Sequence, residues 1–281
     1  MKRLRIVHKT GFSYQGQVKA SYNEARMLPS TTDGQFVLSS TIEIQPTASQ
    51  HAYVDYFGTR VTAFELLTPH QELSLQASSL VEVRPRAHAE ASTSWDDLPG
   101  IAGLRLETQE QTAQTRRTEP SEDLMTLARD IAEKHDNPCE AASEIARTIG
   151  EQMEYVQGVT SVHTSAAEAW ADRRGVCQDI THIVLGALRS VGIPARYVSG
   201  YLHPKPNAEI GETVVGESHA WVEWFCGSWH GFDPTNMLDI GDRHVLVGRG
   251  RDYQDVAPLR GVYAGPFRSS LFVSVEITRE A

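Results

Sequence analysis

The chain has 281 residues, which is long enough for two units that each bury their own hydrophobic core. It carries 26 Lys and Arg against 36 Asp and Glu, and this net charge of −10 repels phosphate backbones, so we expect no nucleic-acid partner. No apolar run approaches the ~20 residues that span a bilayer, and we expect no membrane partner. The oligomeric state stays open.

The three cysteines are Cys139, Cys177 and Cys226, and an odd number cannot all pair with one another. No two of them form a Cys-x-x-Cys motif. We therefore expect a reduced, cytoplasmic setting. The first nine residues are basic at the start but lack an apolar segment and a small-residue cleavage site, so they predict a first strand.

The first part of the chain has strand signals and little helical period. Residues 1–85 contain short apolar stretches bounded by Gly, Pro and Asp, which predicts a small antiparallel β-sandwich domain. We find no catalytic constellation in it. Residues 86–120 are rich in Ala, Ser, Thr, Gln and Glu and predict a linker, although Trp95 and Leu98 interrupt it and suggest that part packs against a neighbour.

The remaining residues, 121–281, predict an α+β domain. A capping pattern at Ser121 starts one helix, and a second helix follows Asn137-Pro138. Strand patterns then dominate after residue 195, so helices come first and an antiparallel sheet follows. Cys139 lies in the first turn of the second helix, but no His and carboxylate block accompanies it, and we expect a structural role.

The most informative stretch is residues 174–179, which leads into a helix ending near residue 191. Its apolar positions recur at steps of three and one, the period of a helix that buries one stripe. Cys177 lies three residues before the first of them, so its thiol stands at the helix start. Gly175 can take backbone angles that suit a sharp entry turn. The free N–H groups and the positive dipole end of a helix N-terminus favour a thiolate.

Residues 218–235 predict a β-hairpin whose turn contains Cys226. With a three-residue loop centred on Cys226 or its neighbour, His219 and Asp233 share a face, directly opposite or one diagonal step apart. Cys177, His219 and Asp233 then stand in the order of a thiol triad: nucleophile, base, and a carboxylate that orients the base.

Four sequence blocks, 175–179, 192–201, 219–223 and 232–236, resemble the transglutaminase-like core, and most closely the bacterial members of the cysteine peptidase type. The first hundred or so residues resemble the all-β domain that precedes the core in that group. The resemblance implies a papain-like or transglutaminase-like core. It also implies Cys177 as nucleophile, His219 as general base and acid, and Asp233 as the orienting carboxylate.

The chemistry expected of such a triad is acyl transfer through a thioester. We expect hydrolysis of a peptide or protein amide substrate, as in a cysteine peptidase or amidase. The same residues serve a protein-glutamine transglutaminase, in which an amine rather than water captures the thioester. A non-enzymatic scaffold or binding protein is the third interpretation.

The oxyanion of the tetrahedral intermediate needs hydrogen-bond donors. The backbone N–H of Cys177 is the first candidate, and Gln178 or Tyr155 is a candidate for the second donor.

A metal site is the remaining alternative, built from His230 and His244 with His219 and Cys226. Their spacing matches no closed tetrahedral pattern, and we expect neither a metal nor another cofactor.

Overall fold

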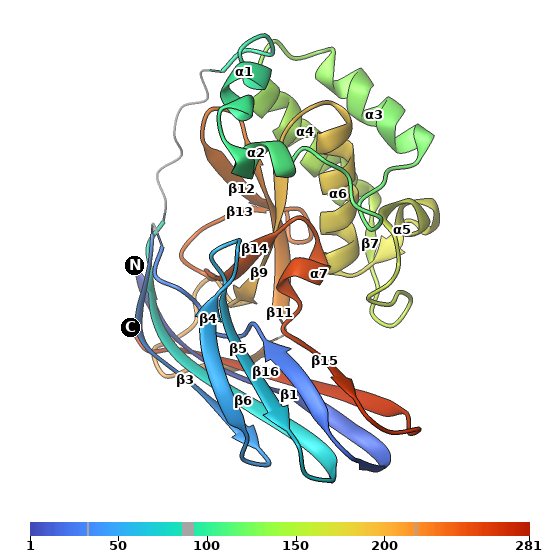
Figure 1. Ribbon diagram of the computed structural model, residues 1–281. Helices are drawn as coiled ribbons and strands as arrows, with labels where there is room; N and C mark the ends of the chain where they lie inside the picture. The colour runs from blue at the N-terminus through green and yellow to red at the C-terminus, as the bar shows by residue number, and fades with distance from the viewer. Residues whose placement is uncertain (33, 86–92, 217) are drawn as a thin grey trace.

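The computed structural model describes residues 1–32, 34–85, 93–216 and 218–281. Figure 1 shows long strands in the lower half and helices gathered beside a second sheet in the upper half, with the two chain ends close together. The strands of the first part are β1 (Lys2–Val18), β2 (Ser21–Ala25), β3 (Gln35–Gln45), β4 (Ser49–Val54), β5 (Arg60–Leu66) and β6 (His70–Val83).

The helices are α1 (Leu98–Gly103), α2 (Leu106–Glu110), α3 (Glu122–Ala132), α4 (Pro138–Gln152), α5 (Ala166–Asp172), α6 (Cys177–Ser190) and α7 (Tyr253–Val256). The later strands are β7 (Glu154–Tyr155), β8 (Arg174–Gly175), β9 (Ala195–Leu202), β10 (Thr213–Gly216), β11 (Ser218–Phe225), β12 (Trp229–Asp233), β13 (Leu238–Asp239), β14 (His244–Gly250), β15 (Leu259–Tyr263) and β16 (Ser269–Arg279).

Two antiparallel sheets form a β-sandwich. One has the order β10-β16-β1-β6-β3, and the other has the order β15-β2-β5-β4. Phe64 and Leu66 of β5 pack with Leu73 and Leu75 of β6 in a core shared by both sheets, because alternate residues of a strand face the same side. The predicted N-terminal antiparallel sandwich is confirmed.

The last two strands of the chain belong to this sandwich. β16 pairs with β1 from Leu4 opposite Arg279 to Tyr14 opposite Ser269, and β15 pairs with β2. Figure 1 shows these C-terminal strands beside the first strands. Alternation predicts a strand but not its partner. The domain boundaries near residues 85 and 120 stay a prediction. The strands β15 and β16, which fall in the predicted second domain, pair with strands of the β-sandwich.

The second unit, which we call the α+β unit, is built on the antiparallel sheet β13-β12-β11-β9-β14. Helix α6 packs on it, and Ile183 and Val184 share a buried apolar cluster with Tyr197 of β9 and Val222 of β11. α3, α4 and α5 contribute to the same cluster. The predicted α+β class, with the cysteine helix packed on an antiparallel sheet, is confirmed.

Part of the predicted linker folds onto the α+β unit. Residues 86–92 lie outside the described residues, but α1 and α2 follow directly. Arg196 of β9 donates to the Glu107 carboxylate at 2.6 Å, and the N–H of Ala195 donates to the carbonyl of Gln111 at 2.9 Å. The described part of the predicted linker therefore packs against β9 of this sheet.

The β-sandwich and the α+β unit share an interface. Leu4 and Ile6 of β1 belong to one apolar cluster with Val245 of β14. Gln35 of β3 is buried there, and its side chain accepts from the N–H of Leu246 and donates to the carbonyl of Leu246, both at 2.8 Å. Gln35 thereby extends the hydrogen bonding of β14 across the interface.

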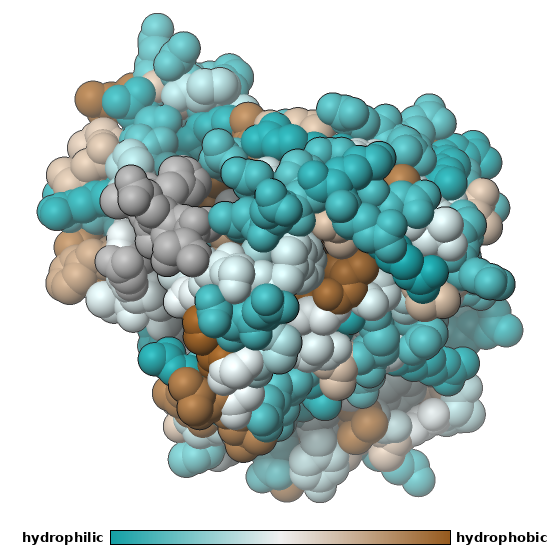
Figure 2. All heavy atoms as spheres, turned by 90° about the horizontal axis from the view of Figure 1, so that it is seen from above, coloured by the Kyte–Doolittle hydropathy of each residue, from teal (hydrophilic) through white to brown (hydrophobic). Residues whose placement is uncertain are grey.

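The face of the molecule drawn in Figure 2 is mainly polar. Seen from above, it is mostly hydrophilic, with hydrophobic side chains in small separate groups (Figure 2), as the net charge of −10 leads us to expect. Within the described part of the chain, no helix is long and apolar enough to cross a membrane.

Replacing Gln35 should weaken this interface. Gln35→Leu leaves the buried N–H and carbonyl of Leu246 without partners, and we expect the free energy of unfolding to fall by about 2–3 kcal/mol. Urea unfolding measures the change. Gln50→Leu, at an exposed position of edge strand β4, is the matched control and should stay within about 0.5 kcal/mol of the parent. Equal effects of the two substitutions would contradict the interface role.

Candidate active site

Cys177 is the first residue of α6, as the sequence predicts. The preceding N–H of Val176 donates to the Asp179 carboxylate at 2.8 Å, and the Thr160 hydroxyl donates to the same oxygen at 2.6 Å. Asp179 is buried, and its burial raises its pKa above the ordinary value despite these two donors. The carboxylate caps the helix from inside its first turn. The entry of the chain into α6 is thereby held in one conformation.

Gly175 is needed for a different reason from the one we inferred. Its backbone does not take a positive φ, so conformational freedom does not explain it. A Cβ there would lie 2.7 Å from Oδ2 of Asp179 and 2.8 Å from its Cβ. Gly175 therefore makes room for the carboxylate that caps α6.

His219 and Asp233 come together through the register of one hairpin. β11 and β12 are joined by residues 226–228, and Val222 lies opposite Phe232. Asp233 is then one diagonal step from His219, one of the two arrangements expected from the sequence. The Nε2 atom of His219 lies 2.7 Å from Oδ2 of Asp233.

The His219 ring is hydrogen-bonded to Asp233 and lies near enough to Cys177 for the thiol to raise the pKa of the ring. Burial by itself lowers the pKa of His219, but the hydrogen bonds and charges of Asp233 and Cys177 outweigh it and raise the pKa to about 10. Nε2 is bonded to Asp233, so Nδ1 is the nitrogen left for the thiol. The three side chains form a continuous chain in the order Cys177, His219, Asp233.

Asp233 has no exposed surface, and its two oxygens are both occupied. Besides His219, Oδ2 accepts from the Asn236 amide at 2.9 Å and lies 3.3 Å from Nε2 of His244. Oδ1 accepts from the N–H groups of Thr235 and Asn236, both at 3.1 Å. Burial raises the pKa of Asp233, but the hydrogen bonds from His219 and His244 outweigh it and hold the pKa well below the ordinary range.

His244 supports Asp233 from a strand that is not its neighbour in the sheet. Its Nδ1 accepts from the N–H of Gly241 at 3.3 Å, which leaves the proton on Nε2, facing Asp233. Burial lowers the pKa of His244, which favours the neutral form of its ring. Sequence reasoning missed this role and that of Asn236. The spacing of His244 from Asp233 in the sequence does not indicate their contact, because β14 pairs with β9 and not with β12.

Cys177 and His219 open into a cavity of about 330 Å³, and Gln178 and Tyr155 line the same cavity. Gln178 is buried, whereas Tyr155 is 44% exposed. The first N–H groups of a helix have no acceptor within the helix, so the backbone at Cys177 and Gln178 can serve a bound oxyanion. The choice between Gln178 and Tyr155 as second donor stays a prediction.

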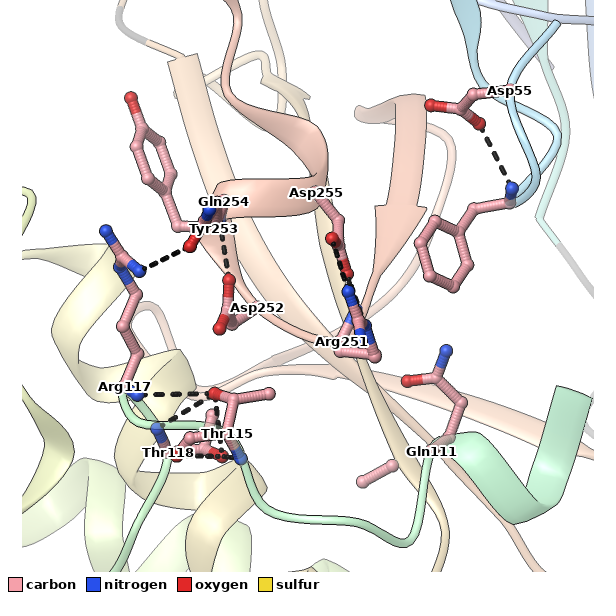
Figure 3. A network of polar contacts seen from close by, with 12 residues as sticks. Asp55, Gln111, Thr115, Arg117, Thr118, Arg251, Asp252, Tyr253, Gln254 and Asp255 are labelled. Atoms are coloured by element: carbon pink, nitrogen blue, oxygen red, sulfur yellow. Dashed lines mark hydrogen bonds and ion pairs between the residues drawn. The ribbon is translucent and has the colours of Figure 1, made fainter.

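The short helix α7 contributes Tyr253 to the same cavity. Figure 3 shows how it is held: Arg251 is paired with Asp255 at 2.9 Å, and Arg117 donates to the Gln254 side chain at 3.0 Å. These contacts tie α7 to the end of β14 and to the segment before α3. Tyr253 is thereby fixed beside Cys177.

Cys139 and Cys226 form a disulfide, with their Cα atoms 5.7 Å apart, and Cys177 is the free cysteine. The bond joins the start of α4 to the turn between β11 and β12. This is a structural role for Cys139, and it removes the argument from reduced cysteines to a cytoplasmic setting, because disulfides persist mainly in oxidising compartments.

The residues of the metal alternative divide between two places. His219 and His244 both contact Asp233. Cys226 and His230 lie with Cys139, with ligand atoms within 4.8 Å of one another. The two sulfurs of that second group are bonded to each other, and thiolates are the form that binds metal. The four residues therefore do not gather into one metal site.

The disulfide predicts a specific thiol count. In the folded, non-reduced protein we expect one thiol to react with a thiol reagent, and three after reduction and unfolding. Reduction should lower the free energy of unfolding by about 2–4 kcal/mol, because the bond closes a long loop. Cys139→Ser should show the same loss without reductant. Three reactive thiols in the untreated protein would contradict the bond.

The Asp233 contact predicts a pH-dependent stability. The raised pKa of His219 means that its contribution is complete below pH 6.5, its unperturbed value, and is lost as pH rises towards 10. In Asp233→Asn the charged partner is gone while burial remains, so the loss of stability between pH 6.5 and 10 should shrink. Urea unfolding at pH 5, 7 and 9.5 measures it. Equal pH dependence in both proteins would contradict the assignment.

The chain is similar to known proteins over both of its units. The bacterial transglutaminase-like N-terminal region matches residues 4–82, and the transglutaminase-like superfamily matches residues 125–234. An uncharacterized protein of Mycobacterium leprae is 43% identical over 282 residues, covering 100% of both chains. Another from Mycobacterium tuberculosis is 29% identical over 98% of this chain and 92% of its own.

A solved structure shows the same fold. The crystal structure of a "Putative Cysteine Protease" from Cytophaga hutchinsonii has a TM-score of 0.80 at 22% identity, covering 100% of this chain and 92% of that chain. That match runs through both the β-sandwich and the α+β unit. The two family matches show that this chain belongs to the transglutaminase-like superfamily and carries the bacterial transglutaminase-like N-terminal region before its core.

Proposed function

We propose that this protein is an enzyme that hydrolyses peptide or amide bonds by acyl transfer to Cys177. The observation that carries the proposal is the His219 ring, which is hydrogen-bonded to Asp233 and interacts with Cys177. Cys177 and His219 both line a cavity that a substrate can enter. The superfamily and the protease name of a solved structural relative support the same chemistry.

In the acylation step, the Cys177 thiolate attacks the carbonyl carbon of the scissile amide and forms a C–S bond. The carbonyl electrons move to oxygen, and the backbone N–H groups at the start of α6 stabilise the oxyanion, with Gln178 or Tyr155 as second donor. The oxyanion then collapses, the C–N bond breaks, and His219 gives its proton to the leaving amine. The product is a thioester on Cys177.

In the deacylation step, neutral His219 accepts a proton from water as the water oxygen attacks the thioester carbon. The second tetrahedral intermediate collapses, the C–S bond breaks, and a carboxylic acid leaves. Cys177 is again a thiolate and His219 is again an imidazolium. Asp233 keeps its charge throughout, holds the ring orientation and stabilises the imidazolium.

The same residues support capture of the thioester by an amine, which would make the protein a transglutaminase. A non-enzymatic scaffold needs no hydrogen-bonded triad, and the intact chain of contacts from Cys177 to Asp233 favours an enzyme over that interpretation. Capture of the thioester by water and capture by an amine give different products, a carboxylic acid and a new amide.

Selective alkylation tests the thiol. Iodoacetamide should label Cys177 well below pH 8, because His219 holds a proton close to the thiolate. In His219→Ala we expect labelling at pH 6 to slow by about tenfold or more. Peptide mass spectrometry locates and quantifies the label between pH 5 and 9.

The matched control for this experiment is His230→Ala, which removes a histidine from the same hairpin but not from the triad. Its labelling rate should equal that of the parent. Equal slowing in both variants, or unchanged labelling in His219→Ala, would refute the thiolate and imidazolium pair.

Product analysis distinguishes water from amine. We would incubate the protein with a mixture of peptides in heavy-oxygen water containing cadaverine, a primary diamine. Hydrolysis places heavy oxygen in new carboxyl groups, and amine transfer attaches cadaverine. We expect heavy oxygen to predominate and Cys177→Ala to give neither product while unfolding at the same temperature as the parent. Activity that survives in Cys177→Ala would refute the mechanism, and cadaverine as the main label would favour the transglutaminase.

A further inference from the structure

The cavity beside Cys177 is shared by both units of the protein. Cys177, Gln178 and His219 come from the α+β unit. Strands β1 and β16 of the β-sandwich supply another part of the wall. The residues that they contribute are His8, Thr10, Leu271, Val273 and Ser274.

On β1 the inward face changes character where the cavity begins. Leu4 and Ile6 are buried in the apolar interface between the units. Two and four residues further on, His8 and Thr10 take the same face and are also buried, but they line the cavity. The Thr10 hydroxyl is used within the sheet, because it donates to the carbonyl of Phe272 at 3.0 Å.

The tautomer of His8 follows from its neighbours. The Tyr201 hydroxyl lies 3.0 Å from the carbonyl of Met27, and a carbonyl can only accept, so the single hydroxyl proton points there. The same hydroxyl lies 2.9 Å from Nδ1 of His8 and has no second proton to donate. It therefore accepts a hydrogen bond from Nδ1, and the ring proton is on Nδ1. Burial lowers the pKa of His8 to about 4, so the ring is neutral at pH 7.

Nε2 of His8 is therefore unprotonated and can only accept a hydrogen bond. It is buried and has no hydrogen-bond partner among the described residues. A buried acceptor without a donor costs about 1–3 kcal/mol, and such a group in a folded protein therefore calls for an explanation. His8 lines the cavity, and a ligand there whose N–H group reaches Nε2 would satisfy this acceptor.

Apart from Cys177 and His219, which form the ion pair of the proposed function, the wall of the cavity is uncharged. Among the described residues that line the cavity there is no Asp, Glu, Lys or Arg. Leu271 and Val273 are 56% and 49% exposed, although they continue the buried face of β16. A charged group beside Leu271 and Val273 would lose its hydration without gaining an opposite charge there, which is unfavourable, whereas an apolar group gains contact with these two side chains.

We propose that the cavity binds an uncharged peptide segment with small apolar side chains, and that an amide N–H of this segment donates to Nε2 of His8. The inference rests on the proposed function, because it names the substrate class of the same site. His8 is a specificity-determining residue on the β-sandwich, and the apolar side chains lie against Leu271 and Val273.

The test uses acetyl-Ala-Ala-chloromethyl ketone, in which the Cys177 thiolate displaces chloride and forms a thioether. Its labelling rate is compared with that of the same ketone methylated at both amide nitrogens, which cannot donate. The ratio of the two rates should fall by roughly 3- to 10-fold in His8→Asn, which keeps a donor near Tyr201 but has no acceptor at the Nε2 position. His8→Gln places an amide oxygen near that position and should preserve the ratio.

Two controls separate binding from chemistry. Lys9→Ala changes the next, exposed residue of β1 and should leave the ratio unchanged. Iodoacetamide, which makes none of the peptide contacts, should label Cys177 equally fast in all four proteins. Ketones with Glu or Lys in place of the second Ala should react at least about tenfold more slowly than the Ala ketone with the parent.

An unchanged ratio in His8→Asn would overturn the role of His8, and fast reaction of the Glu or Lys ketones would overturn the uncharged substrate class. Failure of iodoacetamide to select Cys177 would instead refute the proposed function. In that case the inference is still tested by NMR titration of acetyl-Ala-Ala-amide into Cys177→Ala. If adding His8→Asn to Cys177→Ala weakens peptide binding several-fold, the inference is supported. If binding does not weaken, the inference is overturned.

Discussion

The buried carboxylate of Asp233 is the contact on which the candidate site depends. An isolated charge without solvent exposure is costly, and this one is stable because its two oxygens accept from five groups. The donors come from β11, from the turn after β12 and from the start of β14. The carboxylate therefore holds these three parts together and in return gives the His219 ring one orientation.

The thiol side of the site is held by a separate set of contacts. Asp179 caps α6 and Gly175 leaves space for it, so the position of Cys177 depends on the first turn of one helix. The Cys139 to Cys226 bond then ties the hairpin turn to α4, which packs in the same core as α6. The nucleophile and its base are thus anchored in one hydrophobic core, although they come from different elements.

The sequence pattern predicted those elements whose conformation depends on residues close together in the chain. The period of apolar residues located α6, and the three-residue loop was enough to bring His219 near Asp233. Two features depend on contacts between strands that the local pattern does not pair, and they carry no local signal. These are the pairing of β16 with β1 and the approach of His244 to Asp233. The disulfide was missed for the same reason, since 87 residues separate its cysteines.

The β-sandwich has a direct part in the chemistry that we propose. Its strands β1 and β16 begin and end the chain, pair with each other along their length, and together line the cavity that holds Cys177. The cavity can therefore form only after the two ends of the chain have met. The motifs of the α+β unit supply the reacting groups, but the wall that a substrate must fit includes His8, Leu271 and Val273, which lie outside those motifs. Two proteins with the same triad and different residues on these strands would then share a reaction and differ in substrate.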